Sequence, residues 1–286
     1  MDLVPAFLEQ KIPIGTWARM LVDYLTDNFH AQFRLFSEGL DWLIQGFVFL
    51  LNAIPPLIFI AGLMVLSFWL HRKIKLAIGI GLSLLLILNL GYWEQTIETI
   101  ALVVYATLIS CIIGIPLGIV AAHHSRLYTM LRPILDLMQT IPTFVYLIPT
   151  LMLFGLGMVP GLISTVIFAI PAPIRLTHLG ISRVPQHLID AGKAFGANRM
   201  QLLFKVELPH ALPNIMAGLN QCIMLSLSMV VIAALVGADG LGKPVVRALN
   251  SVNIAQGIEA GLAIVIVAIV LDRLLKQPGR SPEESM

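Results

Sequence analysis

The chain has 286 residues, of which 58% are hydrophobic and only 12% charged, and its mean hydropathy is +0.89. Soluble domains carry roughly 25% charged residues, so the composition excludes an ordinary soluble enzyme and predicts a membrane protein. The 18 basic and 16 acidic residues nearly cancel at a net charge of +2. The overall charge therefore gives no support for nucleic-acid binding.

Acidic residues dominate the first part of the chain. Residues 1–41 hold six acids against three bases, and the pattern from Trp17 to Phe36 is compatible with an amphipathic helix. We expect residues 1–41 to form an extracytoplasmic tail that is partly helical. A transmembrane domain is predicted over residues 42–276, followed by a cytoplasmic tail at 277–286.

Long apolar blocks predict about seven membrane-spanning helices, since each crossing needs about 20 mostly apolar residues. Residues 137–174 carry no charge and are too long for one crossing, and Gly155, Gly157, Pro160 and Gly161 indicate a turn within them. The predicted spans are 54–70, 76–93, 99–122, two within 137–174, 212–236 and 256–275. The expected fold class is an all-α polytopic membrane protein.

Positive charge is distributed unevenly between the two sides of these spans. The loops on one side, with the C-terminal tail, hold thirteen Lys and Arg residues, and the other side holds five. Short cytoplasmic loops are enriched in Lys and Arg. The N-terminus is therefore expected outside and the C-terminus inside. In this assignment Arg175 opens a polar stretch on the cytoplasmic side, just after the fifth span.

Charged residues are expected to be absent from the middle of the spans. Asp136 lies near the inner end of the fourth span, four residues after Arg132, and this spacing favours an ion pair along one helix. An ion-coupled carrier needs an ionisable group within its helix bundle. The sequence therefore favours an energy source other than an ion bound by this chain.

The segment 184–213 is the longest polar stretch on the predicted cytoplasmic side. Pro185 can begin a helix, Gly196 can end it, Asn198 can cap a second short helix, and Pro209 can stop that one. The pattern predicts a pair of short helices lying across the membrane face. Judged only from these helix start and stop residues, the two short helices could simply pack on the membrane-spanning helices of this chain.

This segment resembles the coupling-loop signature of binding-protein-dependent ABC importer permeases, which reads E-A-A, three residues, G, nine residues, I-x-L-P. The chain keeps every spacing, with Asp for Glu, Gly for Ala and Val for Ile. The resemblance implies a type I (MetI-like) permease fold and an ATPase-coupling loop at 183–212. The matching positions are Asp190, Ala191, Gly192, Gly196, Val206, Leu208 and Pro209.

Three further stretches narrow the resemblance. They are similar to stretches of the permeases for glycine betaine, proline betaine and related quaternary ammonium solutes. The three stretches are LRPILDLMQTIPTFVYLIPTLMLFG (131–155), MLSLSMVVIAALVGADGLG (224–242) and EAGLAIVIVAIVLDR (259–273). This resemblance covers most of the chain from about Trp42 onward. It implies an importer subunit in the inner membrane of a prokaryote, surrounded by lipid. The implied partners are a cytoplasmic ATPase, an extracytoplasmic binding protein and a second permease, often a copy of the same chain.

A permease also needs a path for its solute. Prolines within spans free backbone carbonyls, which can line such a path or merely kink a helix. The residues expected to line the path are Gln139, Thr140, Pro142, Phe144, Tyr146, Pro149 and Ser228.

Residues 237–243 imitate a nucleotide-binding loop. They match G-x-x-x-x-G-K, but Pro244 stands where Ser or Thr would contact magnesium, and a membrane span precedes them in place of a strand. We therefore expect no cofactor on this chain, with ATP and magnesium on the partner ATPase. The histidines lack metal-ligand spacing, so no metal site and no catalytic residue is expected.

Three alternatives remain open at this point. The chain could be an ion-coupled secondary carrier that acts alone, or a permease of the same ABC class for choline or carnitine. It could also be a membrane anchor or receptor that transports nothing, since a short helix pair can bind a cytoplasmic partner in that role too.

Overall fold

The computed structural model describes residues 13–275, which are built from helices and short connections with no strand among them. The predicted all-helical class is confirmed. The expected C-terminal tail at 277–286 and the first twelve residues lie outside the described part. The helices are α2 (Ile14–Asn52), α3 (Pro56–His71), α4 (Ile74–Asn89), α5 (Trp93–His123), α6 (Ser125–Thr140), α7 (Thr143–Phe154), α8 (Met158–Ala169), α9 (Pro171–Ser182), α10 (Gln186–Ala194), α11 (Arg199–Leu202), a π-helical turn η1 (Leu203–Glu207), α12 (Leu208–Ala234), α13 (Gly242–Asn250) and α14 (Ile254–Leu275).

The N-terminal part is one long helix. α2 is 39 residues long and is kinked at Phe29, where φ is −123° and ψ is 15°. It runs through residue 41, where we expected the tail to give way to the transmembrane domain. The helix breaks at Pro55, because proline lacks the amide hydrogen needed to continue the ladder, and α3 leaves α2 at an angle of 91°.

Apolar helices match the predicted spans in position. Within residues 13–275, four helical segments are long and apolar enough to cross a membrane, or up to six when each of two sharply bent pairs is taken as one span. α4 is a shorter apolar helix. The number seven stays a prediction. The segment expected to begin at 137 begins instead at Ser125, because α6 is amphipathic and its polar face lowers the local hydropathy.

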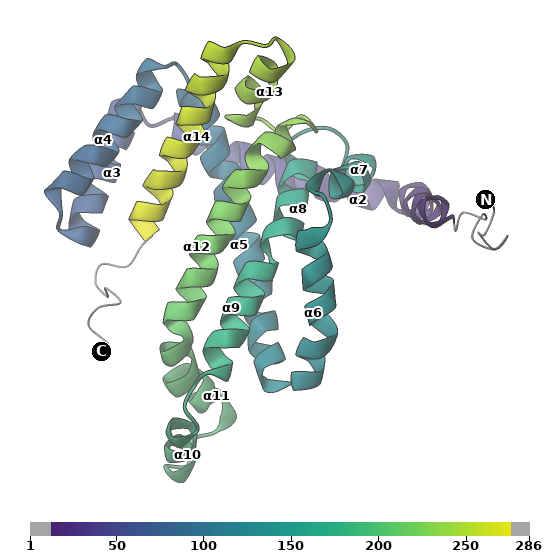
Figure 1. Ribbon diagram of the computed structural model, residues 1–286, viewed down its shortest axis with the longest axis vertical. Helices are drawn as coiled ribbons and strands as arrows, with labels where there is room; N and C mark the ends of the chain where they lie inside the picture. Colours follow the sequence, from purple (N-terminus) through teal and green to yellow (C-terminus); the bar gives the residue numbers. More distant parts are fainter. Residues whose placement is uncertain (1–12, 276–286) are drawn as a thin grey trace, which may run out of the picture.

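One uninterrupted helical run follows α11, η1 and α12. These elements join without a loop into a single apolar segment of 36 residues, Arg199–Ala234. In Figure 1, α10 and α11 lie at one end of the molecule and α13 lies near the opposite end. α12 connects the two.

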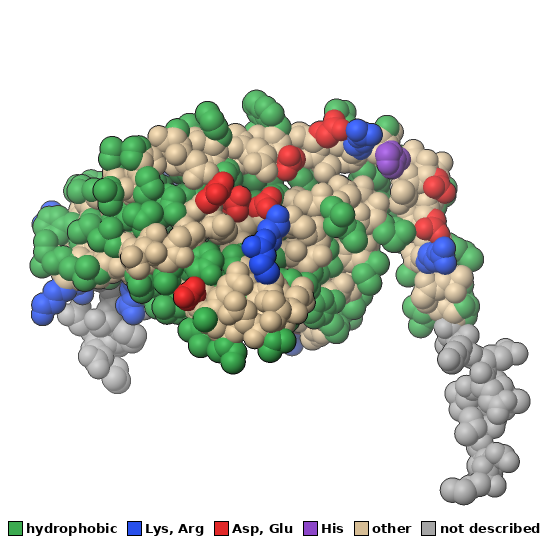
Figure 2. Space-filling model, turned by 90° about the horizontal axis from the view of Figure 1, so that it is seen from above, with side chains coloured by type: hydrophobic (Ala, Val, Ile, Leu, Met, Phe, Trp, Pro, Cys, Tyr) green, Lys and Arg blue, Asp and Glu red, His purple; other side chains and the backbone are tan. Residues whose placement is uncertain are grey.

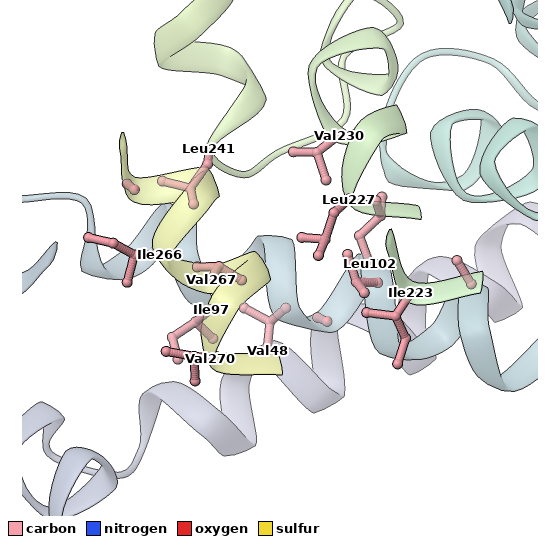
Figure 3. Packing of buried hydrophobic residues seen from close by; sticks show 14 of the residues in the cluster. Val48, Ile97, Leu102, Ile223, Leu227, Val230, Leu241, Ile266, Val267 and Val270 are labelled. Carbon is pink, nitrogen blue, oxygen red and sulfur yellow. The ribbon is translucent and has the colours of Figure 1, made fainter. Parts of the chain in front are cut away.

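The main hydrophobic core lies between α2, α5, α12 and α14. Figure 3 shows Val48 of α2, Leu102 of α5, Leu227 of α12 and Val267 of α14 meeting there, and each of these side chains is buried. Dispersion between close-packed aliphatic groups is the main attraction between helices in lipid, where apolar burial gives little advantage.

Small residues allow α5, α9 and α12 to approach closely. A Cβ atom added at Gly118 of α5 would lie 2.7 Å from the carbonyl oxygen of Ile174 in α9, and one at Gly114 would lie 2.9 Å from Pro173. Toward α12, a Cβ at Gly180 of α9 would lie 2.9 Å from Asn214. α9 is therefore held close to both α5 and α12, at distances that side chains larger than glycine would prevent.

The outside of the molecule is strongly apolar. Exposed large hydrophobic side chains occur on every long helix, such as Trp69 at 76% and Phe49 at 77% exposure. Figure 2, which looks onto the end opposite α10, shows hydrophobic side chains around the rim and acidic side chains gathered on the end face. An apolar rim of this kind fits a lipid environment.

Candidate coupling loop and solute path

The residues of the predicted coupling loop form a projecting pair of helices. α10 has no buried residue and protrudes at the end of the molecule with α11 (Figure 1). Asp190, Ala191, Gly196 and Pro209 are exposed. The remaining three motif residues, Gly192, Val206 and Leu208, are half-buried. Within this segment, the exposed positions are thus available to a partner and the half-buried ones hold the pair together.

The turn between the two short helices depends on Gly196. Its φ of +75° lies in the left-handed region, and a Cβ added there would meet no atom within 4 Å. The amide of Ala197 donates to the carbonyl of Gly192 at 3.1 Å, which closes the end of α10. Asn198 then starts α11 with a capping box, in which Gln201 donates to the Asn198 side chain and accepts from its amide.

Gly192 stands where the family signature has alanine, and its surroundings show why glycine suits this chain. An added Cβ would lie 2.5 Å from Cδ2 of Leu202 and 3.7 Å from Val206. Leu202 is buried at 7% exposure. Glycine thus lets α10 approach α11, while α10 still extends across position 192 despite glycine's weak helix propensity.

A buried carboxylate connects the coupling loop to α5. Glu207, within the motif Val206-Glu207-Leu208-Pro209, is only 7% exposed, and its Oε2 lies 2.9 Å from Nε2 of His123 at the end of α5. Glu207 is the last residue of the π-helical turn η1. π-helical turns are rare and occur often at functional sites. Glu207 and His123 have no counterpart among the expected site residues.

Exposed apolar side chains at the tip of the pair were also missed. Phe195 is 93% exposed, Met200 62% and Phe204 60%. Hydrophobic periodicity did not indicate them, because the segment is too short and too polar to show a helical repeat of apolar residues. Large exposed apolar groups in a polar setting indicate a surface that binds a partner. The signal available in the sequence was the presence of two phenylalanines in a loop predicted to face water.

The expected path residues lie mostly around one break in the chain. α6 ends at Thr140, Pro142 precedes α7, and the two helices are bent by 94°. Pro142 has no amide hydrogen to donate to the carbonyl of Met138. The hydroxyl of Tyr146 lies 2.6 Å from that oxygen and 2.7 Å from the carbonyl of Ile141. Tyr146 thus supplies the donor that proline lacks.

We expect Tyr146→Phe to lower the unfolding free energy by about 1–3 kcal/mol, because the Met138 carbonyl would lose its donor in an apolar environment. Thermal unfolding of the detergent-solubilised protein measures this. Tyr24→Phe is the matched control, since Tyr24 is 60% exposed on α2. Equal melting temperatures for the two variants would show that the Tyr146 hydroxyl does not support the break.

The other expected path residues differ in their exposure. Phe144 is 56% exposed, Thr140 and Pro142 are exposed, and Gln139 and Pro149 are half-buried. Ser228 lies on a different element, α12, where it is exposed and its hydroxyl donates to the carbonyl of Met224 at 3.0 Å. The structure therefore groups six of the expected path residues around the α6–α7 break and places Ser228 apart from them.

The positions of Asp136 and Arg175 differ from two predictions made from the sequence. Arg175 lies inside α9, in the apolar segment Met158–Ser182, and so it does not open a cytoplasmic loop. Its Nη2 donates to Oδ1 of Asp136 at 2.7 Å, so Asp136 pairs with α9 and not with Arg132 of its own helix. The hydropathy window ended the fifth span at Ile174 because it could not anticipate a charge paired with another helix. One turn farther along α9, His178 stacks on Tyr128 of α6 with centroids 3.5 Å apart.

The loop that imitates a nucleotide site has a structural role here. It connects α12 to α13, and the amide of Leu241 donates to Oγ1 of Thr99 in α5 at 2.8 Å. Glycine at 240 has φ of +121°, and an added Cβ would lie 2.7 Å from the same Thr99 oxygen. The loop is thus packed against α5. No group of three or more His, Cys, Asp or Glu residues suited to a metal occurs within residues 13–275.

The apolar helices together with the projecting helix pair define a permease subunit of an ABC importer in the inner membrane. Residues 114–276 match the family model described as the binding-protein-dependent transport system inner membrane component, and the chain belongs to this family. It is 44% identical over 274 residues to the glycine betaine transport system permease protein of Bacillus subtilis (strain 168), covering 96% of this chain and 95% of that protein.

Two other relatives carry similar names. The glycine betaine/proline betaine transport system permease protein of Escherichia coli (strain K12) is 42% identical, over 98% of this chain and 78% of its own. The glycine betaine/carnitine transport permease protein of Listeria monocytogenes is 45% identical, over 92% of this chain and 94% of its own. All these relatives are transport permeases, so this chain is a transporter subunit.

The fold is similar to that of a solved permease. Inward-facing structures of the MetNI methionine ABC transporter match with a TM-score of 0.56 at 23% identity, over 62% of this chain and 91% of that chain. The expected MetI-like fold is confirmed by this likeness.

Proposed function

We propose that the chain imports glycine betaine or a related zwitterionic quaternary ammonium solute as part of an ATP-driven transporter. The observation that carries this proposal is the similarity over 92–98% of this chain, at 42–45% identity, to permeases named for glycine betaine. Carnitine is a zwitterion of this class and appears in the name of one of these relatives, whereas choline, for which another relative is named, is a cation and the nearest alternative outside the class.

In this proposal a separate ATPase binds ATP and magnesium and contacts the coupling loop at Asp190, Ala191, Gly192, Gly196, Val206, Leu208 and Pro209. The support is the projection of α10 together with exposed Phe195, Met200 and Phe204. Aromatic and methionine side chains are enriched at the centres of interfaces. Closure of the ATPases would move the pair as a rigid body, and the His123–Glu207 contact would carry this motion to α5.

The complete transporter would contain an extracytoplasmic binding protein and two permease copies. The coupling loop would face the cytoplasm, with the N-terminus outside. Support for a second copy comes from the face formed by α6, α9 and α12, which lie side by side in front of α5 in Figure 1. Exposed polar residues such as Asp136, Gln221 and Ser228 lie on these helices, and polar side chains are costly against lipid.

The test is uptake of labelled glycine betaine by proteoliposomes that contain the permease, its ATPase and its binding protein. We expect accumulation with ATP inside the vesicles, and none when ATP is replaced by a sodium or proton gradient. Uptake driven by the gradient alone, or by the permease without its partners, would favour a secondary carrier. Normal assembly with no flux of any of these solutes would favour a membrane anchor.

A further inference from the structure

A stripe of polar residues runs along α6 and continues on α9. On α6 the residues Ser125, Thr129, Arg132, Asp136 and Gln139 recur at intervals of three or four, which places them on one face of the helix, and none of them is buried. On α9, Arg175, His178 and Ser182 follow the same spacing and are half-buried or exposed. Each of the two helices therefore carries a polar stripe.

The ion pair between Asp136 and Arg175 crosses from one stripe to the other. With a rise of 1.5 Å per residue, Asp136 lies about 16 Å along α6 from Ser125, and Arg175 lies about 10 Å along α9 from Ser182. Asp136 thus lies one turn before the end of α6, and Arg175 lies within the apolar segment Met158–Ser182. Its side chains are 53% and 33% exposed, so neither is enclosed by the other helices of this chain.

A half-exposed ion pair at this position does not fit a surface in contact with lipid. Charged groups in the hydrocarbon region are costly and typically face the interior of a bundle or a water-filled cavity. The opposite side of α9 packs closely against α5 and α12, so the pair lies on the open face of α6, α9 and α12. This is the face that the proposed function assigns to the second permease copy and the solute.

We propose that Asp136 and Arg175 form a transient binding site for the zwitterionic solute within its path. The guanidinium of Arg175 would hold the solute carboxylate, and the carboxylate of Asp136 would hold the quaternary ammonium. This inference rests on the proposed function and adds to it the residues that contact the solute inside the permease.

The geometry of the pair suits such an exchange. Among the described residues, a single N–H···O hydrogen bond joins the two side chains, so the guanidinium keeps further donors and the carboxylate a second oxygen. Ion pairs exposed to water contribute only about 0–1 kcal/mol, so opening this one costs little. A zwitterion supplies one charge of each sign, and thus neither Asp136 nor Arg175 is left unpaired when it binds.

A purely cationic solute cannot make the same exchange. Choline shares the trimethylammonium group of glycine betaine but has no carboxylate, so its binding to Asp136 would leave Arg175 without a partner. Arg175 would lose its hydrogen bond to Asp136 without gaining a carboxylate in return. The pair should therefore discriminate between the two solutes by this penalty.

Direct binding is the first test. Saturation-transfer NMR with glycine betaine and with choline is measured on the permease–ATPase complex without its binding protein, so that only sites within the complex contribute. We expect a signal from glycine betaine, a signal about tenfold weaker from choline, and loss of the betaine signal in the double variant Asp136→Asn/Arg175→Gln. Equal signals from the two solutes, or an unchanged betaine signal in the double variant, would overturn the site.

Transport by the complete transporter separates solute binding from a structural role. Asp136→Asn and Arg175→Gln should each lower the kcat of betaine uptake about tenfold with little change in KM, since the binding protein captures the solute first. Arg175→Lys should recover part of the rate. The double variant leaves no unpaired charge, so it would regain full activity if the pair only stabilised the fold, and this result too would reject the proposal.

The control variant is Glu38→Gln, which breaks the exposed Arg34–Glu38 pair of α2, 2.9 Å long, and should leave uptake unchanged. Uptake by the unmodified transporter distinguishes the two levels of the proposal. If it accumulates no betaine, the proposed function fails and the zwitterion site fails with it. If it accumulates betaine while the Asp136 and Arg175 variants match the control, only the site is rejected.

Discussion

Replacing Gly196 with valine is expected to reduce the substrate-stimulated ATP hydrolysis of the assembled transporter to its unstimulated rate. The backbone at Gly196 has φ of +75°, and the space around its Cα is open, so the penalty comes from the backbone and not from a clash. A β-branched residue in this conformation costs about 1–3 kcal/mol, which is enough to rearrange a short turn exposed to solvent. The relative position of α10 and α11 would then be lost.

Gly91 provides the matched control for this variant. It has φ of +78°, also has no atom within 4 Å of an added Cβ, and lies between α4 and α5, away from the coupling loop. Gly91→Val should cause similar backbone strain but leave the stimulation of ATP hydrolysis intact. If both variants kept full stimulation in reconstituted vesicles, the Gly196 turn would have no part in coupling.

Gly118→Leu is expected to prevent the protein from folding, whereas Gly118→Ala should lower its stability by about 1–3 kcal/mol. An alanine methyl at this position would lie 2.7 Å from both the Ile174 carbonyl oxygen and Cβ of Thr177, so α5 and α9 would have to separate. The contact between α5 and α9 is among the most extensive between helices of residues 13–275. The measurements are the yield of monodisperse protein in detergent and its thermal unfolding.

Gly79→Leu is the corresponding control, because Gly79 lies in α4 with no atom within 4 Å of an added Cβ. Both changes replace glycine with a good helix former inside an apolar helix, so they differ only in the space available. A normal yield of Gly118→Leu would mean that α5 and α9 do not need their close approach.

The sequence predicted the elements that depend on local signals. Pro185, Gly196 and Asn198 indicated the helix pair correctly, because caps and turns are determined by neighbouring residues. The expectation that Pro209 ends the second helix was wrong: proline is tolerated in the first turn of a helix, and Pro209 lies at the start of α12, which continues from α11 and η1 without a loop.

The α6–α7 break at Pro142 was not predicted, because the apolar residues from 137 to the turn near Gly155 were taken as one continuous span. Hydropathy could not show the 94° bend, since both helices have apolar residues on either side of it.

The parts that could not be predicted depend on pairs of residues distant in the chain. Arg175 was assigned to a loop because its partner, Asp136, is 39 residues away. The contact between His123 and Glu207 was not predicted for the same reason, since these residues are also far apart in the chain. The motif Gly114-Ile115-Pro116-Leu117-Gly118 was available as a small-residue packing signal, but its partner helix was not.

The uninterrupted run of α11, η1 and α12 has a mechanical consequence. At 1.5 Å per residue, its 36 residues extend about 54 Å, from the projecting pair to the loop that rests on Thr99. A rod of this length that tilts by about 5° moves its far end by about 5 Å. A small rotation at the projecting pair would thereby be carried to the loop at the other end of the run, because no loop interrupts the helix between them.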